Sequence, residues 1–187
     1  MTPIAPLITG FLREHLPVTQ GASPHTCDTY AHAFRLLFTF ASARLGCRPS
    51  QLGLEQFDAA LVLAFLSHLE QQRGNTPATR NSRLAAIKAF MRYIEVRVPA
   101  ALALAGQIHA IPTKRHSQAL VRHLTMTEIR ALLNAPDLST RLGIRDRAML
   151  HLCFAGGLRV SELVGLPLDH LSLRPSPSIR VTGKGRR

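Results

Sequence analysis

Apolar residues recur three or four positions apart through most of the first hundred residues, which is the spacing of a helix with one buried face. Four stretches show this spacing and predict helices at residues 6–16, 23–46, 55–74 and 76–97. In the second stretch Ser23 or Thr26 can cap the start and Gly46 can end the helix, whereas the first stretch is expected to end before Pro17. Four helices in about a hundred residues predict a compact helical domain.

The pattern breaks at residues 107–123, where basic side chains and Pro112 replace any apolar period. We interpret this stretch as a linker, with an ordinary solvated loop as the alternative. The predicted organisation is therefore a helical domain at 1–106, a linker at 107–123 and a second domain at 124–187.

The second domain combines helical and strand-like patterns. Thr125 and Glu128 form a capping-box signature that begins a helix at 125–136. Two further helices are predicted at residues 144–155 and 159–166, and a strand at 178–182 that runs into a turn at 183–185. We expect the helix at 144–155 to be strongly buried and to end at Gly156 and Gly157, and we expect the strand to pair with residues near 169–173.

Composition limits the class of protein. Of the 187 residues, 46% are hydrophobic, which is enough to build a core, and no apolar run approaches the roughly 20 residues of a membrane span. The N-terminus lacks the pattern of a secretory signal. Cys27, Cys47 and Cys153 have no metal-ligand spacing and are expected to be free thiols in a reducing cytoplasm.

Charge gives the first indication of a partner. The chain carries 23 Lys and Arg against 11 Asp and Glu, a formal net charge of +12. Such an excess favours a polyanion, most simply nucleic acid. Charge alone does not exclude a ribosomal protein or a protein that binds a membrane surface. The dominance of arginine over lysine can also reflect a GC-rich genome.

One segment carries a specific motif. The stretch "RDRAMLHLCFAGGLRVSELVGLPLDHLSL" is followed by "IRVTGKGRR", so Arg-Asp-Arg, Gly-Leu-Arg-x-Ser-Glu-Leu, an Asp and Gly-Lys-Gly occur in order. This arrangement resembles the tyrosine recombinases, the phage-integrase and Xer-type family. The N-terminal helices, including "TPATRNSRLAAIKAFMRYI", look like the helical core-binding domain of that family.

The resemblance implies a mainly α fold, with a helical SAM-like core-binding domain followed by the truncated start of an α+β catalytic domain. The implied partner is double-stranded DNA, joined by other recombinase protomers in a full-length form, with no membrane involved. In this family a tyrosine attacks a DNA phosphodiester without a metal or another cofactor, so cationic side chains must neutralise the transition state.

The resemblance also implies roles for three residues. Arg159 matches the first catalytic arginine, Glu162 can pair with its guanidinium from one turn away, and Lys184 matches the lysine that protonates the leaving oxygen. The alternatives without a catalytic role are a surface ion pair for Arg159 and Glu162, and an exposed position in a hairpin turn for Lys184.

Further residues are predicted to contact DNA. By resemblance, the helix at 76–97 grips the major groove, and the linker is expected to lie along DNA. The predicted contacts are Arg80, Arg83, Lys88, Thr26, Tyr30, Lys114 and Arg115. A solvated helix face is the alternative for the first three, and a helix cap and a core position are the alternatives for Thr26 and Tyr30.

Several family features are missing from residues 1–187. The family also needs a His-x-x-Arg motif, a further His or Trp, and the nucleophilic tyrosine. The sequence "HAFR" at His32 to Arg35 lies in a helix of the first domain, and we interpret it as a chance match. Tyr30 and Tyr93 also lie in N-terminal helices.

We therefore expect a truncated recombinase that cannot cleave DNA alone. The alternatives are a relative of the type IB topoisomerases and a helical DNA-binding module without a role in recombination.

Overall fold

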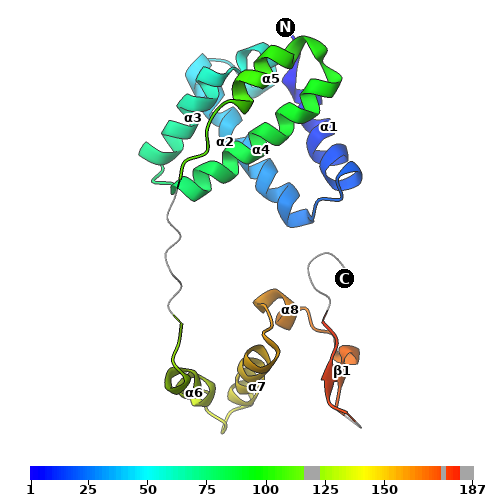
Figure 1. The fold of residues 1–187 in the computed structure, drawn as a ribbon, viewed down its shortest axis with the longest axis vertical. Coiled ribbons are helices and arrows are strands. Elements are labelled where there is room, and N and C mark those ends of the chain that lie inside the picture. The colour runs from blue at the N-terminus through cyan, green and yellow to red at the C-terminus, as the bar shows by residue number, and fades with distance from the viewer. Residues whose placement is uncertain (116–122, 174–175, 182–187) are drawn as a thin grey trace. The chain divides into compact units, whose positions relative to one another are not determined.

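The computed structural model describes residues 1–115, 123–173 and 176–181. The chain divides into two compact units, Met1–Gln118 and Ala119–Arg187 (Figure 1). The first unit is entirely helical among its described residues, apart from turns and one isolated bridge between Pro3 and Gly53.

The first unit is built from six main helical segments. They are α1 (Ile4–Gly10), the π-helix η1 (Phe11–Thr19), α2 (Pro24–Leu45), α3 (Ala59–Gln71), α4 (Pro77–Arg97) and α5 (Leu102–His109). Short 3₁₀ turns at Pro49–Gln51, Leu54–Gln56 and Pro99–Ala101 connect some of them. The predicted helices in the ranges 23–46, 55–74 and 76–97 are confirmed, and so is the mainly α fold.

Local capping explains where these helices begin. The Ser23 side chain accepts a hydrogen bond from the backbone of Thr26, and Thr76 accepts one from the backbone of Thr79, each at 3.3 Å. Asp58 does the same for Leu61 at 2.7 Å, so α3 begins at Ala59. These side chains satisfy amide groups that have no partner within the helix.

The prediction that the first helix ends before Pro17 is wrong. The chain stays helical to Thr19, with Pro17 inside a π-helical segment. Burial explains the difference, because Phe11 and Leu16 are 0% and 1% exposed and their packing outweighs the hydrogen bond that proline cannot donate.

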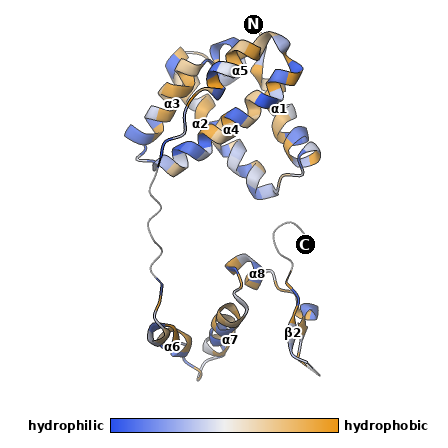
Figure 2. Cartoon of the chain, in the orientation of Figure 1, coloured by the Kyte–Doolittle hydropathy of each residue, from blue (hydrophilic) through white to orange (hydrophobic). Residues whose placement is uncertain are grey.

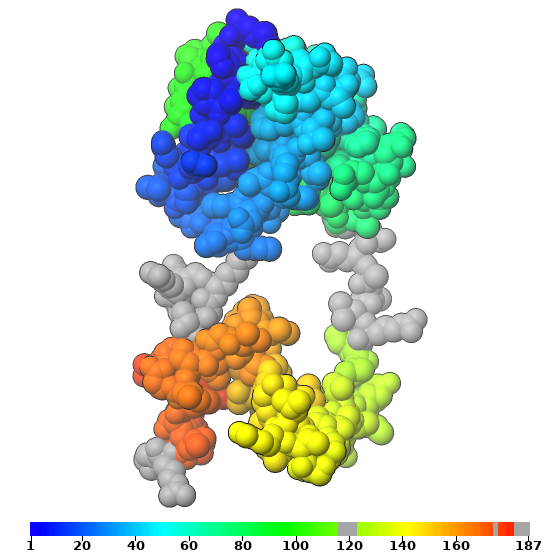
Figure 3. Space-filling model, turned by 180° about the vertical axis from the view of Figure 1, so that it is seen from behind, coloured from blue at the N-terminus to red at the C-terminus, as the bar shows by residue number. Residues whose placement is uncertain are grey.

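A cluster of phenylalanine rings forms the centre of the first unit. The rings of Phe11, Phe34 and Phe90 lie edge to face, with Phe11 6.0 Å from Phe34 and Phe90 5.4 Å from each of the others. This is the favoured geometry of aromatic pairs, and it joins η1, α2 and α4. The helices of this unit carry both apolar and polar residues (Figure 2), and the space-filling view shows their side chains forming a continuous surface over the face in view (Figure 3).

Helix α5 corrects the predicted domain boundary. Residues 107–109 belong to this helix, and Ile108 and Ile111 are buried in the core. The linker predicted at 107–123 therefore begins too early, because its first residues pack as part of the helical unit.

The second unit contains α6 (Met126–Asn134), α7 (Arg141–Gly156), α8 (Val160–Val164) and a 3₁₀ turn at Leu168–His170. The predicted capping box is confirmed, since the Thr125 amide donates to Glu128 at 2.7 Å and the Glu128 amide donates to Thr125 at 3.3 Å. Strand β1 (Leu171–Ser172) pairs antiparallel with β2 (Ser178–Ile179), as expected for the strand and its partner.

The expectation of a strongly buried α7 is wrong for the described structure. Ile144 and Phe154 are 56% and 51% exposed, and Leu133 of α6 is the only buried hydrophobic side chain among the described residues of this unit. The described helices and the two-stranded sheet are too few to cover the apolar side of α7.

Candidate functional site

The turn between α7 and α8 positions Arg159. Helix α7 ends at Gly157, whose φ of 60° places it in the left-handed region that favours glycine. Arg159 then stands at the N-cap of α8 with extended backbone. The helix end predicted at Gly156 and Gly157 is confirmed, and so is the start of the next helix at Arg159.

Glu162 fixes the direction of Arg159 as expected. Its carboxylate accepts from the Arg159 backbone amide at 2.8 Å and from guanidinium Nη1 at 2.7 Å. These bonds, the backbone one first, hold the pKa of Glu162 below its ordinary value. The Arg159 side chain is 72% exposed, so its remaining donors are open to an anion.

Two residues predicted to contact DNA instead donate hydrogen bonds to backbone carbonyls within the first unit. Arg80 is 4% exposed and donates from Nη1 to the Pro112 carbonyl at 2.9 Å. Lys88 donates from Nζ to the carbonyls of His109 and Ile111 at 2.9 and 2.7 Å. The predicted surface contact at Arg80 is thus corrected, because its guanidinium is buried against the chain.

The other predicted contacts in the first unit differ in their exposure. Arg83 is half-buried and donates to the Thr29 carbonyl at 3.4 Å, and burial lowers its pKa. Thr26 is half-buried in the first turn of α2, bonded to Ser23. Tyr30 is half-buried and packs against the core.

Two of the remaining predicted residues lie near the end of the first unit, and the third is not among the residues that the structure describes. Lys114 forms an ion pair with Glu70 at 2.8 Å, and Arg115 is exposed. Lys184 lies outside the described residues.

Sequence reasoning missed a group of cations in the first unit. His32 and Arg35 lie one turn apart on α2, and Arg35 Nη2 is 2.7 Å from His32 Nδ1, which accepts when the imidazole is neutral. Burial lowers the pKa of His32, and the positive charges of Arg83, Arg35 and Arg73 lower it further. We call these four residues the His32 cluster.

The His32 cluster lacks acidic compensation. Among the described residues, Arg35, Arg73 and Arg83 form no ion pair with a carboxylate. Like charges gathered without a counter-ion raise the local positive potential and favour an anion. The i, i+3 spacing of His32 and Arg35 was the signal in the sequence, but it was interpreted only as a chance match to a catalytic motif.

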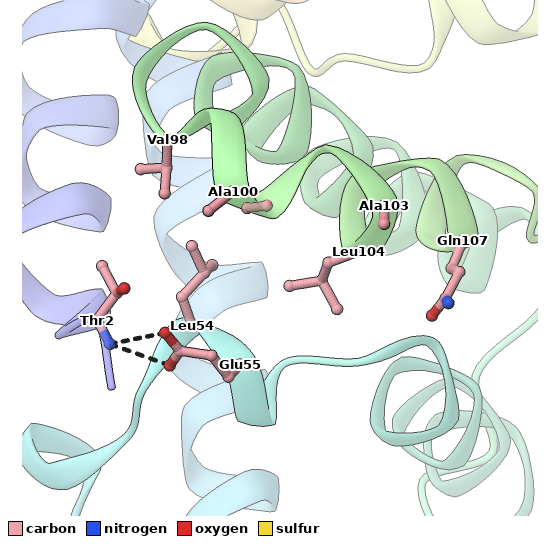
Figure 4. Close-up of a pocket in the computed structure, with 9 residues that line it drawn as sticks. Thr2, Leu54, Glu55, Val98, Ala100, Ala103, Leu104 and Gln107 are labelled. Carbon is pink, nitrogen blue, oxygen red and sulfur yellow. Dashed lines mark hydrogen bonds between the residues drawn. The ribbon is translucent and has the colours of Figure 1, made fainter.

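The pocket beside the N-terminus is a weaker candidate. It has a volume of about 330 Å³ and is lined mainly by alanine, leucine and valine side chains (Figure 4). Its carboxylate, that of Glu55, accepts from the Thr2 amide at 2.8 and 3.0 Å. That contact ties the N-terminus to the unit and leaves little polar chemistry for a ligand.

Within 1–115, 123–173 and 176–181, no group of three or more His, Cys, Asp or Glu side chains is arranged to hold a metal ion. No helix in the described parts of the chain is both long and apolar enough to span a bilayer.

Comparison with known proteins agrees with the motif. Residues 8–97 match the family "Phage integrase, N-terminal SAM-like domain", and residues 122–187 match "Phage integrase family". A solved structure of the XerH site-specific recombinase, bound to a palindromic difH substrate, shares the fold with a TM-score of 0.62 at 22% identity. It matches 89% of this chain and 48% of its own.

Longer relatives match nearly the whole chain. The protein y4rC of Sinorhizobium fredii (strain NBRC 101917 / NGR234), whose name describes it as an integrase/recombinase, is 44% identical over 184 residues. Tyrosine recombinase XerC of Myxococcus xanthus is 36% identical over 185 residues. These matches cover 98% and 99% of this chain but 55% and 58% of the relatives. The chain belongs to the phage integrase family of tyrosine recombinases.

Proposed function

We propose that this chain binds duplex DNA as part of a site-specific tyrosine recombinase, with the His32 cluster contacting backbone phosphates. The observation that carries the proposal is the cluster itself: three arginines gather around one histidine, and none of them forms an ion pair among the described residues. Phosphate oxygens are matched acceptors for guanidinium groups. The formal net charge of +12 favours the same partner.

In this proposal Arg159 stabilises the phosphate that reacts. Glu162 accepts one hydrogen bond from the Arg159 backbone amide and one from guanidinium Nη1, and the guanidinium makes no other hydrogen bond to a described residue, so the positive charge is oriented before DNA arrives. Lys184 is proposed as the acid that protonates the leaving oxygen. Duplex DNA is the proposed substrate, other recombinase protomers are the proposed partners, and the cytoplasm is the proposed location.

Neither tyrosine of residues 1–187 suits the role of nucleophile. Tyr93 is 7% exposed, and the Arg97 guanidinium lies 3.8 Å from its ring centre. Tyr30 packs at the edge of the core with its ring 6.4 Å from that of Phe11. We therefore expect residues 1–187, assayed alone, to bind DNA without cleaving it.

The test combines native and denaturing gels. A random duplex pool is enriched for bound molecules, and the selected duplex is then given a nick that traps covalent intermediates. We expect a retarded band that weakens steeply with salt and no covalent adduct. An adduct that disappears in Tyr30→Phe or Tyr93→Phe would overturn the assignment of these tyrosines, and the absence of any retarded band would overturn DNA binding.

A further inference from the structure

A segment after α5 is held along α4 by side chains that include two predicted DNA contacts, Arg80 and Lys88. We call residues 110–115 the strap (Figure 1). Lys88 binds the carbonyls of His109 and Ile111, and Arg80 binds that of Pro112. The strap therefore runs antiparallel to α4, from the middle of the helix toward its N-terminal end.

Asn81 completes this arrangement at the end of the strap. Its amide donates from Nδ2 to the Lys114 carbonyl at 2.7 Å and accepts from the Lys114 amide at 3.0 Å. One side chain thus pairs with both backbone groups of Lys114, as a neighbouring strand would. The ion pair between Lys114 and Glu70 ties the same point to α3.

The energetic pattern indicates a positioning role. Arg80 is the only buried charged residue in the described parts of the chain, and no carboxylate in those parts forms an ion pair with it. Burying a cation is costly unless hydrogen bonds compensate. Arg80 Nη1 donates to the strap carbonyl of Pro112 and to Asn81 Oδ1, whereas the buried Nε has no hydrogen-bond partner among the described residues, so the contact with the strap is the main one that the buried guanidinium makes outside α4. Lys88 also binds the last carbonyl of α5, where the helix dipole favours a positive charge.

We propose that Arg80, Asn81 and Lys88 are positioning residues that fix where the chain leaves the first unit, and so set how the second unit is attached to α4. The proposal rests on the proposed function, because a fixed exit point matters when two units of one chain must engage the same duplex. The strap holds the exit beside Asn81. The three side chains then act on DNA through the second unit and not by touching phosphate.

The experiment compares two lengths of the protein. Residues 1–115 contain the closed core of the first unit and the whole strap, whereas residues 1–187 also contain the second unit. Asn81→Ala and Lys88→Met each release part of the strap. Arg92→Met is the matched control, because it removes an exposed cation from the same helix.

We expect Asn81→Ala and Lys88→Met to weaken DNA binding by residues 1–187 about tenfold, because each variant removes only part of the roughly 10²–10⁴-fold that linking two binding units can contribute. Binding by residues 1–115 should be unchanged. A hydroxyl-radical footprint should lose the protection due to the second unit and keep that due to the first. Equal weakening in both lengths would overturn the proposal in favour of direct DNA contact.

Hydrogen exchange separates this proposal from the proposed function. In Asn81→Ala, exchange at the Lys114 amide should accelerate while amides in the middle of α4 stay protected. If the wild-type protein binds no DNA, the proposed function fails, but this readout still tests the strap. Unchanged exchange at Lys114 would overturn the positioning role even when DNA binds.

Discussion

Removing two arginines of the His32 cluster should flatten the salt dependence of DNA binding. The variant carries Arg35→Gln and Arg73→Gln together. Both side chains are exposed, and glutamine is a good helix former, so the fold should tolerate the changes. The substitutions leave Arg83 and its contact with the Thr29 carbonyl in place.

The expected magnitude follows from counterion release. Each phosphate contact contributes about 0.9 to the slope of log affinity against log salt. A fourfold rise in salt, from about 0.05 to about 0.2 M, therefore weakens each contact about 3.5-fold, and two contacts together about twelvefold. The double variant should lose that twelvefold factor from the salt dependence of the wild-type protein.

Fluorescence anisotropy with a labelled duplex measures this slope. The matched control is Arg13→Gln with Arg48→Gln, which removes the same charge from two other exposed positions of the first unit. The control should leave the slope nearly unchanged. If the two double variants flatten the slope equally, the His32 cluster is not a specific phosphate-binding site and the net charge alone explains DNA binding.

Two further predictions concern stability. Phe90→Ala should lower the free energy of unfolding by about 3–5 kcal/mol in urea titrations. Phe154→Ala, on the exposed side of α7, should change that free energy by about 0.5 kcal/mol or less. Similar losses in the two variants would refute the aromatic core. Folding lowers the pKa of His32 below its ordinary value of 6.5, so the folded state resists protonation of this side chain. The contribution of His32 to stability is therefore present above pH 6.5 and is lost as the pH falls below that value. His32→Gln should therefore flatten the stability profile between about pH 5 and pH 7, which His25→Gln in the first turn of α2 should not do.

The sequence predicted what depends on near neighbours. Capping by Thr125 and Glu128 and the turn at Gly157 involve residues a few positions apart, so their patterns are visible along the chain. Helix α5 was missed because "LALAGQIH" shows no alternation of polar and apolar residues. The role of Arg80 depends on a carbonyl 32 positions away, and no local pattern carries that information.

The arginines and lysines of this chain differ in function according to what lies within reach of each side chain. Arg159 meets a carboxylate that orients it but leaves it exposed, so it can still receive a phosphate. Arg80 and Lys88 meet backbone carbonyls and are withdrawn from the surface. Arg35 meets a neutral imidazole, which accepts one hydrogen bond and cancels no charge. A phosphate gains most where the positive charge is both exposed and uncompensated, and this condition favours the His32 cluster over the cations of α4 that line the strap.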